Sequence, residues 1–412
     1  MPPTNRSLLL RLAPSIYGPT ALFTFGEYAM LPLIPVVAAE MGAGLGLSGV
    51  IASAVVVGRL AGNVPASWVV ARSGERVAML LASAVAFIAA GGVAFAPNPA
   101  LLGLASLLVG FSAAAFALAR HSFMTTRVPL SFRARALSLI GGSDRLGRFA
   151  GPFLAAGLVA LTGTPGSTAW AFAACLVLTA LLLWLAPDPE RVMPAVAAAS
   201  GGDAGAGTGR PSRRGGVLAA MREGRAPLAR VGSCAAILTG VRAIRDVLLP
   251  LWGLSIGMDP TDIALVVAVS GTVDFALFYT SGQVMDRWGR LWAALPATGI
   301  MGLSFLVLAF TSELPGAAAW MVACAVAIGV GNGLSAGIVM TLGADLAPQA
   351  DPASFLAAWR TLSDLGGAVA PLAISAIAAV SMPGAAAVAG ALAVAGAVGF
   401  VRWIPRYVPG AR

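Results

Sequence analysis

Twelve ionisable residues lie inside apolar stretches of this sequence, and they are the residues best able to do chemistry. They are Glu27, Arg59, Arg120, Asp144, Arg145, Arg148, Arg242, Arg245, Asp246, Asp274, Arg360 and Asp364. A charge at the centre of a bilayer costs about 2.5–3.5 kcal/mol on insertion scales, so such residues face water or each other and are functional by default. Carboxylates and arginines in this setting can exchange protons and partners.

Glu27 is the acid best placed for proton exchange, because it lies near the middle of the first apolar stretch, beside Tyr28. We therefore predict that Glu27 couples proton binding to a change of partner. The other residues predicted to line a central cavity are Arg242, Arg245, Asp246 and Asn332. Arg120 and His121 lie near the end of their stretch, where we expect them to reach the membrane interface.

Composition indicates what must position these charges. The chain is 58% hydrophobic and 10% charged, with a mean hydropathy of +0.87, well above the values of soluble domains. Apolar runs of about 20 residues recur along it, the length that a helix needs to cross a bilayer. The net charge of +9 does not indicate nucleic-acid binding, because the arginines cluster between the apolar runs. The sequence therefore predicts an all-α membrane protein.

The hydropathy pattern predicts twelve transmembrane helices in two pseudo-symmetric bundles of six. The expected helices cover 14–38, 46–70, 76–95, 99–123, 136–161, 167–186, 229–256, 262–285, 291–311, 315–345, 353–380 and 383–404. Residues 1–186 form the N-terminal bundle, 187–228 a cytoplasmic linker and 229–412 the C-terminal bundle. The expected inner segments hold arginines and the outer loops hold none, which predicts that both termini are inside.

The two halves repeat each other, as in many transporters. MLP at 30–32 aligns with LLP at 248–250, and SDRLGRFAGP at 143–152 aligns with LSDLGGAVAP at 362–371. The charged loops SWVVARSGER at 67–76 and GQVMDRWGRL at 282–291 align as well, with an offset of 215. In these three registers three aligned pairs have opposite charges, namely Glu27 with Arg245, Arg59 with Asp274, and Arg145 with Asp364. The glycine-rich stretch GVGNGLSAG (329–337) aligns with the helix at Gly110. It lacks the lysine of a nucleotide loop, so we interpret it as a site of close helix packing and bending.

A charged loop, GQVMDRWGR, separates two apolar runs at 282–290. Gly289 allows a left-handed turn, and Gly282 can admit a neighbouring helix closely. Asp286 stands at the negative end of its own helix dipole and needs another partner. We predict that Asp286, with Arg287 and Arg290, latches the cytoplasmic side shut.

This loop resembles the signature loop of the major facilitator superfamily, and the resemblance covers nearly the whole chain. Gly147, Gly151 and Pro152 also resemble the Gly-x-x-x-Gly-Pro motif of its twelve-span drug:proton antiporter branch. The first-half copy of the loop departs from the pattern at Ser67, Ala71 and Glu75. In the family, helix 2 packs on helix 11 and helix 5 on helix 8. The resemblance therefore implies inter-bundle pairs of Arg59 with Asp364 and of Arg145 with Asp274.

The sequence and the resemblance together predict a secondary transporter that works by alternating access. The favoured activity is proton-coupled efflux of a small, partly apolar organic compound. Uptake or facilitated passage of a metabolite, which the arginine surplus suggests is anionic, is an alternative, and a membrane sensor is a third. We expect a multi-pass monomer of the plasma (inner) membrane, with small-molecule substrate, protons and lipid as partners and no nucleic acid. We expect no enzymatic activity, and no cofactor or metal beyond a proton gradient.

Overall fold

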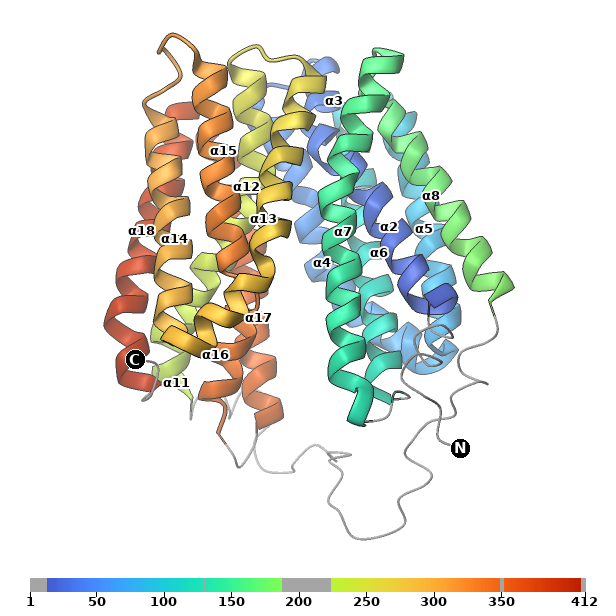
Figure 1. Cartoon of the computed structure of the whole chain (residues 1–412). Helices are drawn as coiled ribbons and strands as arrows, with labels where there is room; N and C mark the ends of the chain where they lie inside the picture. The colour runs from blue at the N-terminus through green and yellow to red at the C-terminus, as the bar shows by residue number, and fades with distance from the viewer. Residues whose placement is uncertain (1–12, 127, 129, 187–223, 349–351, 409–412) are drawn as a thin grey trace. The chain divides into compact units, whose positions relative to one another are not determined.

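The computed structural model describes residues 13–126, 128, 130–186, 224–348 and 352–408, and all of its regular structure is helical (Figure 1). Residues 187–223 of the predicted linker at 187–228 lie outside the described residues. Within the described part, ten helices are long and apolar enough to cross a membrane. The all-α class predicted from the hydropathy pattern is therefore confirmed.

The first half contains six spanning segments. They are η1 Ala13–Tyr17, α2 Gly18–Met30, η2 Leu31–Leu33 and α3 Ile34–Glu40, which together form the first span, then α4 Leu45–Ser73, α5 Glu75–Ala94, α6 Pro99–Thr126, α7 Leu130–Thr162 and α8 Ser167–Leu185. The short 3₁₀ segment η2 follows from Pro32 and Pro35, because a proline cannot donate the backbone hydrogen bond of a regular helix.

The second half repeats this plan. Its elements are α11 Arg225–Pro227, η4 Leu228–Gly232 and α12 Ser233–Ser255, then α13 Pro260–Trp288, α14 Arg290–Ala309, α15 Ala317–Leu334 with α16 Ile338–Leu346, α17 Pro352–Ala378 and α18 Met382–Tyr407. The two long segments outside the ten apolar spans are α7 and α12. Each carries three charged residues near its middle, and these charges lower its hydropathy.

One predicted helix is interrupted. The sequence suggested a single helix over 315–345, but α15 ends at Leu334 and α16 begins at Ile338. Gly337 adopts a φ of +80° at the break, a conformation that glycine takes without steric cost. The glycine-rich stretch therefore bends the chain, as its composition predicted.

The contacts divide the chain into two units. The first comprises Met1–Ala43 and Ala54–Gly205, and the second comprises Gly44–Ser53 and Ala206–Arg412. In the first unit α2 packs on α7 and α8, and α5 packs on α6 and α8. In the second, α12 packs on α17 and α18, and α14 packs on α15 and α18. Each pair in one unit has its counterpart in the other, so the two bundles share one internal arrangement.

Glycines at helix crossings repeat as well. A β-carbon at Gly110 in α6 would lie 1.8 Å from the carbonyl oxygen of Val55 in α4. A β-carbon at Gly329 in α15 would lie 2.5 Å from the carbonyl oxygen of Ser270 in α13. Both glycines let two backbones touch, which is how small residues work at helix interfaces in membranes.

The helix ends correct the register of the first and seventh spans. The positive-φ glycines that follow these spans, Gly42 and Gly257, lie 215 positions apart. The π-helical segments η1 and η4 begin with the same separation. This register places Glu27 opposite Arg242 and Pro35 opposite Pro250. The alignment of Glu27 with Arg245, which rested on two similar tripeptides, is therefore wrong by three positions.

Candidate functional site

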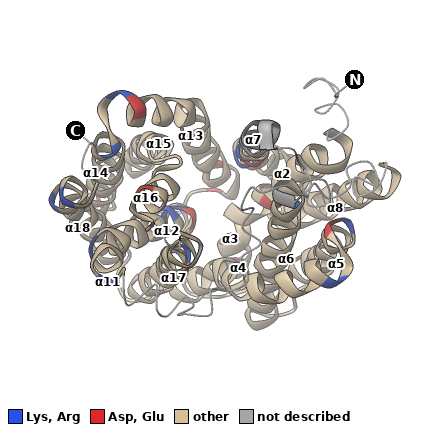
Figure 2. Cartoon of the chain, turned by 90° about the horizontal axis from the view of Figure 1, so that it is seen from below, with Lys and Arg blue, Asp and Glu red and all other residues tan. Residues whose placement is uncertain are grey.

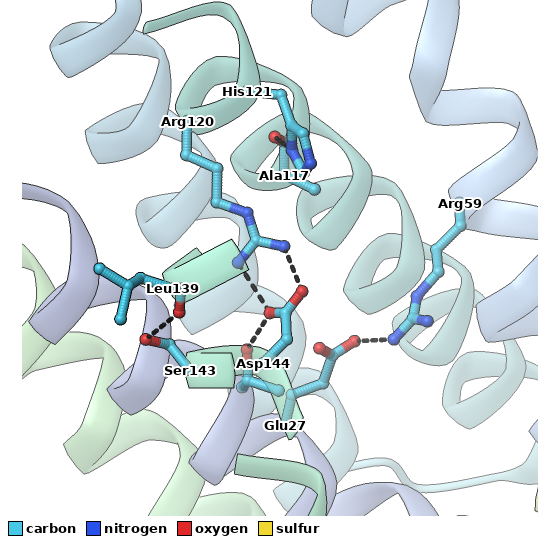
Figure 3. Close-up of polar contacts among 9 residues, drawn as sticks. Glu27, Arg59, Ala117, Arg120, His121, Leu139, Ser143 and Asp144 are labelled. Atoms are coloured by element: carbon cyan, nitrogen blue, oxygen red, sulfur yellow. Dashed lines mark hydrogen bonds and ion pairs between the residues drawn. The ribbon is translucent and has the colours of Figure 1, made fainter. Parts of the chain in front are cut away.

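The first site is an ion pair between Glu27 and Arg59. Glu27 lies midway along the span Pro14–Glu40, and Arg59 lies midway along α4. The Nη2 atom of Arg59 is 2.5 Å from Oε1 of Glu27, and the two side chains are 30% and 5% exposed. Figure 3 shows the two side chains reaching toward each other from different helices. Glu27 is thus buried with an arginine that remains partly accessible.

Packing around α2 fixes the position of Glu27. Phe23, one turn before it, stacks on Phe116 of α6 with ring centroids 4.4 Å apart and meets the edge of Phe172 of α8. A β-carbon at Gly26 would lie 2.8 Å from Phe172, so only glycine allows α2 and α8 to approach this closely. Aromatic and small residues therefore hold the helix that presents the carboxylate.

A second ion pair of the first unit joins Arg120 to Asp144. The guanidinium of Arg120 donates from Nη1 and Nη2 to the two carboxylate oxygens of Asp144, at 2.7 and 2.6 Å. Thr24 donates its hydroxyl to Oδ1 at 3.0 Å. Arg120 is only 5% exposed, so the prediction that it reaches the membrane interface is wrong. A bidentate carboxylate partner outweighs the gain of hydrating the guanidinium.

His121 and Tyr28 have partners near these pairs. Nδ1 of His121, an exposed side chain, lies 2.7 Å from the carbonyl oxygen of Ala117 in its own helix. The guanidinium of Arg148 lies 4.5 Å from the ring centroid of Tyr28, a distance at which a cation and an aromatic face attract each other. Arg148 therefore links α7 to the residue that follows Glu27.

The second unit has its own charged cluster, centred on Asp274 midway along α13. Asn332 of α15 donates its amide to Oδ2 of Asp274 at 2.6 Å. Nη1 of Arg245 in α12 is 3.6 Å from the same oxygen, and its Nε is 3.5 Å from Oδ1 of Asp246. Three helices thus contribute to one charged cluster, in which Asp274 is buried and Asp246 is exposed.

Arg242 lies one turn before this cluster and binds the break between α15 and α16. It donates from Nε to the hydroxyl of Ser335 at 3.0 Å, and from Nη2 to the same hydroxyl and to the backbone carbonyl. Ser281 of α13 donates to the carbonyl of Ala336 at 2.7 Å. These two side chains bind carbonyl groups at the break, and the Ser335 carbonyl also accepts from the backbone nitrogen of Ile338 at 3.3 Å.

The predicted inter-bundle pairs join residues of different units, so they stay predictions. Within its own unit, Asp364 lies 3.7 Å from Arg360, one turn earlier in α17. Arg59 contacts Glu27, and Asp274 contacts Arg245 and Asn332, as described above. Arg145, the remaining member, is partly exposed on α7. The ion pairs named here each join residues of one unit.

The loop between α13 and α14 has the predicted turn. Gly289 adopts a φ of +90°, and Gly74 in the first half adopts +79°. Arg290 contacts Asp345 of α16 at 2.9 Å and donates to the carbonyl of Met285. Asp286 is exposed, so the latch stays a prediction. No atom comes within 4 Å of a β-carbon built at Gly282, and the close approach predicted there is not seen within its unit.

The other arginine of the loop, Arg287, has its guanidinium 5.6 Å from the ring centroid of Trp288.

The Gly-x-x-x-Gly-Pro motif of α7 lies against α2. Gly147 and Gly151 pack on that helix, where added β-carbons would lie 2.7 Å from the Phe25 nitrogen and 2.8 Å from the Ala29 nitrogen. Pro152 lies inside α7 without ending it. The Gly-x-x-x-Gly-Pro motif is thus a helix-packing surface for the helix that carries Glu27.

Ser335 and Asp345 were missed by the sequence analysis. Ser335 is one of many serines, and only the break beside it makes its carbonyl and hydroxyl useful to Arg242. Asp345 lies near the end of an apolar run, where its partner Arg290 is 55 residues away in sequence. The pairing of Arg120 with Asp144 was also missed, because nothing in the spacing indicates which arginine turns inward.

Figure 2 shows few charged residues among mostly uncharged helices. The apolar spans and the charges at the middle of α4 and α13 define a polytopic membrane transport protein. A model of the Major Facilitator Superfamily matches residues 19–371 and 231–412. The chain belongs to this superfamily. No match to a curated protein was found. Membership of the drug:proton antiporter branch stays a prediction.

Solved structures share the fold at low sequence identity. A POT family transporter in complex with a thioalcohol-conjugated peptide is 12% identical, with 95% of each chain covered and a TM-score of 0.74. An auto-inhibited POT family peptide transporter is 15% identical, with 95% of this chain and 96% of the other covered and a TM-score of 0.73. A D-xylose–proton symporter is 14% identical, with 96% and 97% covered and a TM-score of 0.69.

Proposed function

We propose that the chain is a proton-coupled secondary transporter that works by alternating access and exports a small, partly apolar organic compound in exchange for protons. The observation that carries this proposal is the ion pair of Glu27 and Arg59. It combines a buried carboxylate at mid-span with an arginine whose side chain is 30% exposed. A site of this kind can bind and release a proton when its surroundings change.

The energetics of the pair link its proton to the conformation. When Glu27 binds a proton it loses its charge, and Arg59 is left without a carboxylate partner. Stranding one member of a buried ion pair costs about 3–5 kcal/mol. The protonated state is therefore favoured only in a conformation that offers Arg59 water or another anion. The exposure of Arg59 supports such an exchange of partners.

The similar structures support coupling to protons in general, because one of them is a D-xylose–proton symporter. They also favour a second candidate function, uptake of a substrate together with protons. The arginine surplus of the apolar stretches, seven arginines against five acids, would suit an anionic substrate in that case. Export and uptake differ in whether substrate and protons move in opposite directions or in the same direction.

Flux measurements in proteoliposomes test the proposal. Purified protein is reconstituted with a pH gradient imposed in either direction, and a panel of labelled organic compounds of graded polarity and charge is followed. We expect an apolar compound to move against the direction of proton flow. Movement with the protons would replace export by uptake. Movement that ignores the gradient would refute proton coupling, and the absence of any movement would favour a membrane sensor.

A further inference from the structure

Asp274 belongs to a cluster that differs from the other ion pairs of the protein. Its side chain is 12% exposed, and Oδ2 accepts from Nδ2 of Asn332 at 2.6 Å. Nη1 of Arg245 lies 3.6 Å from the same oxygen. Charge-assisted hydrogen bonds between nitrogen and oxygen are about 2.7–2.9 Å long. Asp274 is therefore bound closely by a neutral amide and only loosely by that cation.

Arg245 has a second carboxylate beside it. Its Nε lies 3.5 Å from Oδ1 of Asp246, whose side chain is 44% exposed. The guanidinium is thus shared between a buried acid and an accessible one at nearly equal distances. If Asp274 were neutral, Arg245 would still have Asp246 as an anionic partner. This feature distinguishes the cluster from Glu27 and Arg59, where proton binding strands the arginine.

The amide of Asn332 supplies the second observation. Its Oδ1 atom is buried and has no hydrogen-bond partner within the described residues. The amide nitrogen must face the carboxylate, because the opposite orientation would place two acceptors together. An ionised Asp274 can only accept hydrogen bonds, so it cannot satisfy Oδ1. A protonated Asp274 carries one O–H donor and can.

We propose that Asp274 is a proton-binding site of the second half, in which Asn332 stabilises the protonated form and Asp246 retains Arg245. The carboxylate takes a proton from water and becomes a carboxylic acid. Its O–H then donates to Oδ1 of Asn332, while Nδ2 of Asn332 continues to donate to the other oxygen. The amide and the acid form a closed pair with two hydrogen bonds, and the buried acceptor is satisfied.

The charged groups around Asp274 are compatible with this change. Within its own unit, three helices pack on α13. From α12 come Arg245, Asp246 and Arg242, and the last of these binds Ser335. From α15 comes the neutral amide of Asn332, and the titratable group of that helix is Cys324. From α14 comes Arg290 at its first residue, which contacts Asp345. Proton binding therefore removes one negative charge from the cluster, and Asp246 still compensates the charge of Arg245.

The proton site at Asp274 is additional to the proposed role of Glu27. Its use in transport rests on the proposed function, but its ability to bind a proton does not. With two proton sites, one in each half, each bundle would bind a proton at its own carboxylate. Proton binding itself can be observed without a substrate, so the two ideas can fail separately.

Infrared difference spectroscopy on the purified full chain in lipid, between acid and neutral pH, tests the site. Wild-type protein should show a stretching band of a protonated carboxyl group that disappears in Asp274→Asn and persists in Asp246→Asn. In Asn332→Leu, which retains the acid, the band should shift in frequency because the amide partner is gone. Because Asn332→Leu retains Asp274, it still tests the proposal if Asp274→Asn does not fold.

Glu27→Gln separates this inference from the proposed function. Loss of a different band in Glu27→Gln, with the Asp274 band retained, supports two independent sites. If Glu27→Gln changes nothing while Asp274→Asn removes the band, the second-half site stands and the role of Glu27 fails. The inference is overturned if every wild-type band survives in Asp274→Asn, or if Asn332→Leu leaves the frequency unchanged.

Discussion

Arg59 and Asp274 occupy equivalent mid-span positions in the two halves of the chain and carry opposite charges. Each lies at the centre of a helix of 29 residues, α4 or α13. Each contacts an oppositely charged residue of the helix that begins its own half, Glu27 in α2 or Arg245 in α12. The repeat has therefore kept an ion pair between the first two spans of each half while exchanging which helix carries the acid.

This relationship predicts that the Glu27–Arg59 pair stabilises the first bundle as a unit. Neutralising one member, by Arg59→Gln or Glu27→Gln, leaves a buried charge alone and should lower the free energy of unfolding by about 3–5 kcal/mol. The double variant strands no charge and should lose less than the sum of the two single changes. Thermal unfolding of the purified variants in one detergent measures this. Glu313→Gln, at an exposed loop acid, is the control; additive losses would show that the pair is not coupled.

The Arg120–Asp144 pair should depend on the shape of its cation. Both guanidinium nitrogens donate to the carboxylate, and lysine cannot form this bidentate contact. Arg120→Lys keeps the charge and should still lower thermal stability, and Asp144→Asn should lower it further, by about 3–5 kcal/mol as expected for a stranded buried charge. Unfolding midpoints of the two variants provide the measurement. Full stability in Arg120→Lys would mean that only the charge matters.

Gly110 should tolerate no side chain. A β-carbon there would lie 1.8 Å from the carbonyl oxygen of Val55, so Gly110→Ala must push α4 and α6 apart, at a cost of about 1–3 kcal/mol or more. Gly157→Ala is the matched control, because that helical glycine has nothing within 4 Å of the added carbon. It should be neutral or stabilising. Equal losses in the two variants would contradict the packing argument.

The latch at Asp286 should affect transport without affecting stability. Asp286 is exposed in this structure, so Asp286→Asn should change the free energy of unfolding by no more than about 0.5 kcal/mol. If the acid closes the cytoplasmic side in another conformation, the initial rate of flux in proteoliposomes should fall. Ala71→Asp, which restores the acid in the first-half copy, should also change the rate. A normal rate in well-folded Asp286→Asn would eliminate the latch.

The sequence predicted the fold well because membrane insertion imposes strong constraints on it. Spans of about 20 apolar residues and loops with arginines follow from the thickness and polarity of the bilayer. The turn at Gly289 and the bend in the stretch 329–337 were predicted from the conformational freedom of glycine. Each of these positions requires a residue without a β-carbon.

The partners of the buried charges could not be predicted in the same way. Arg120 has enough length to reach either the interface or Asp144, and only the packing of α6 on α7 decides between them. The register between Glu27 and the seventh span was off by three residues, because short apolar tripeptides recur by chance. Asp345 and Ser335 acquire their roles from residues more than 50 positions away in sequence. Such contacts depend on tertiary packing, which local patterns do not encode.

The most direct test of the central claim is proton movement in proteoliposomes that contain a pH-sensitive dye. A compound transported by the wild-type protein is added outside, and the internal pH and the exchange of labelled compound are recorded for wild type and Glu27→Gln. The account predicts that wild type moves protons in the direction opposite to the compound, while Glu27→Gln exchanges labelled compound across the membrane without moving protons. Proton movement at the wild-type rate in well-folded Glu27→Gln would contradict the assignment of Glu27 as the coupling residue.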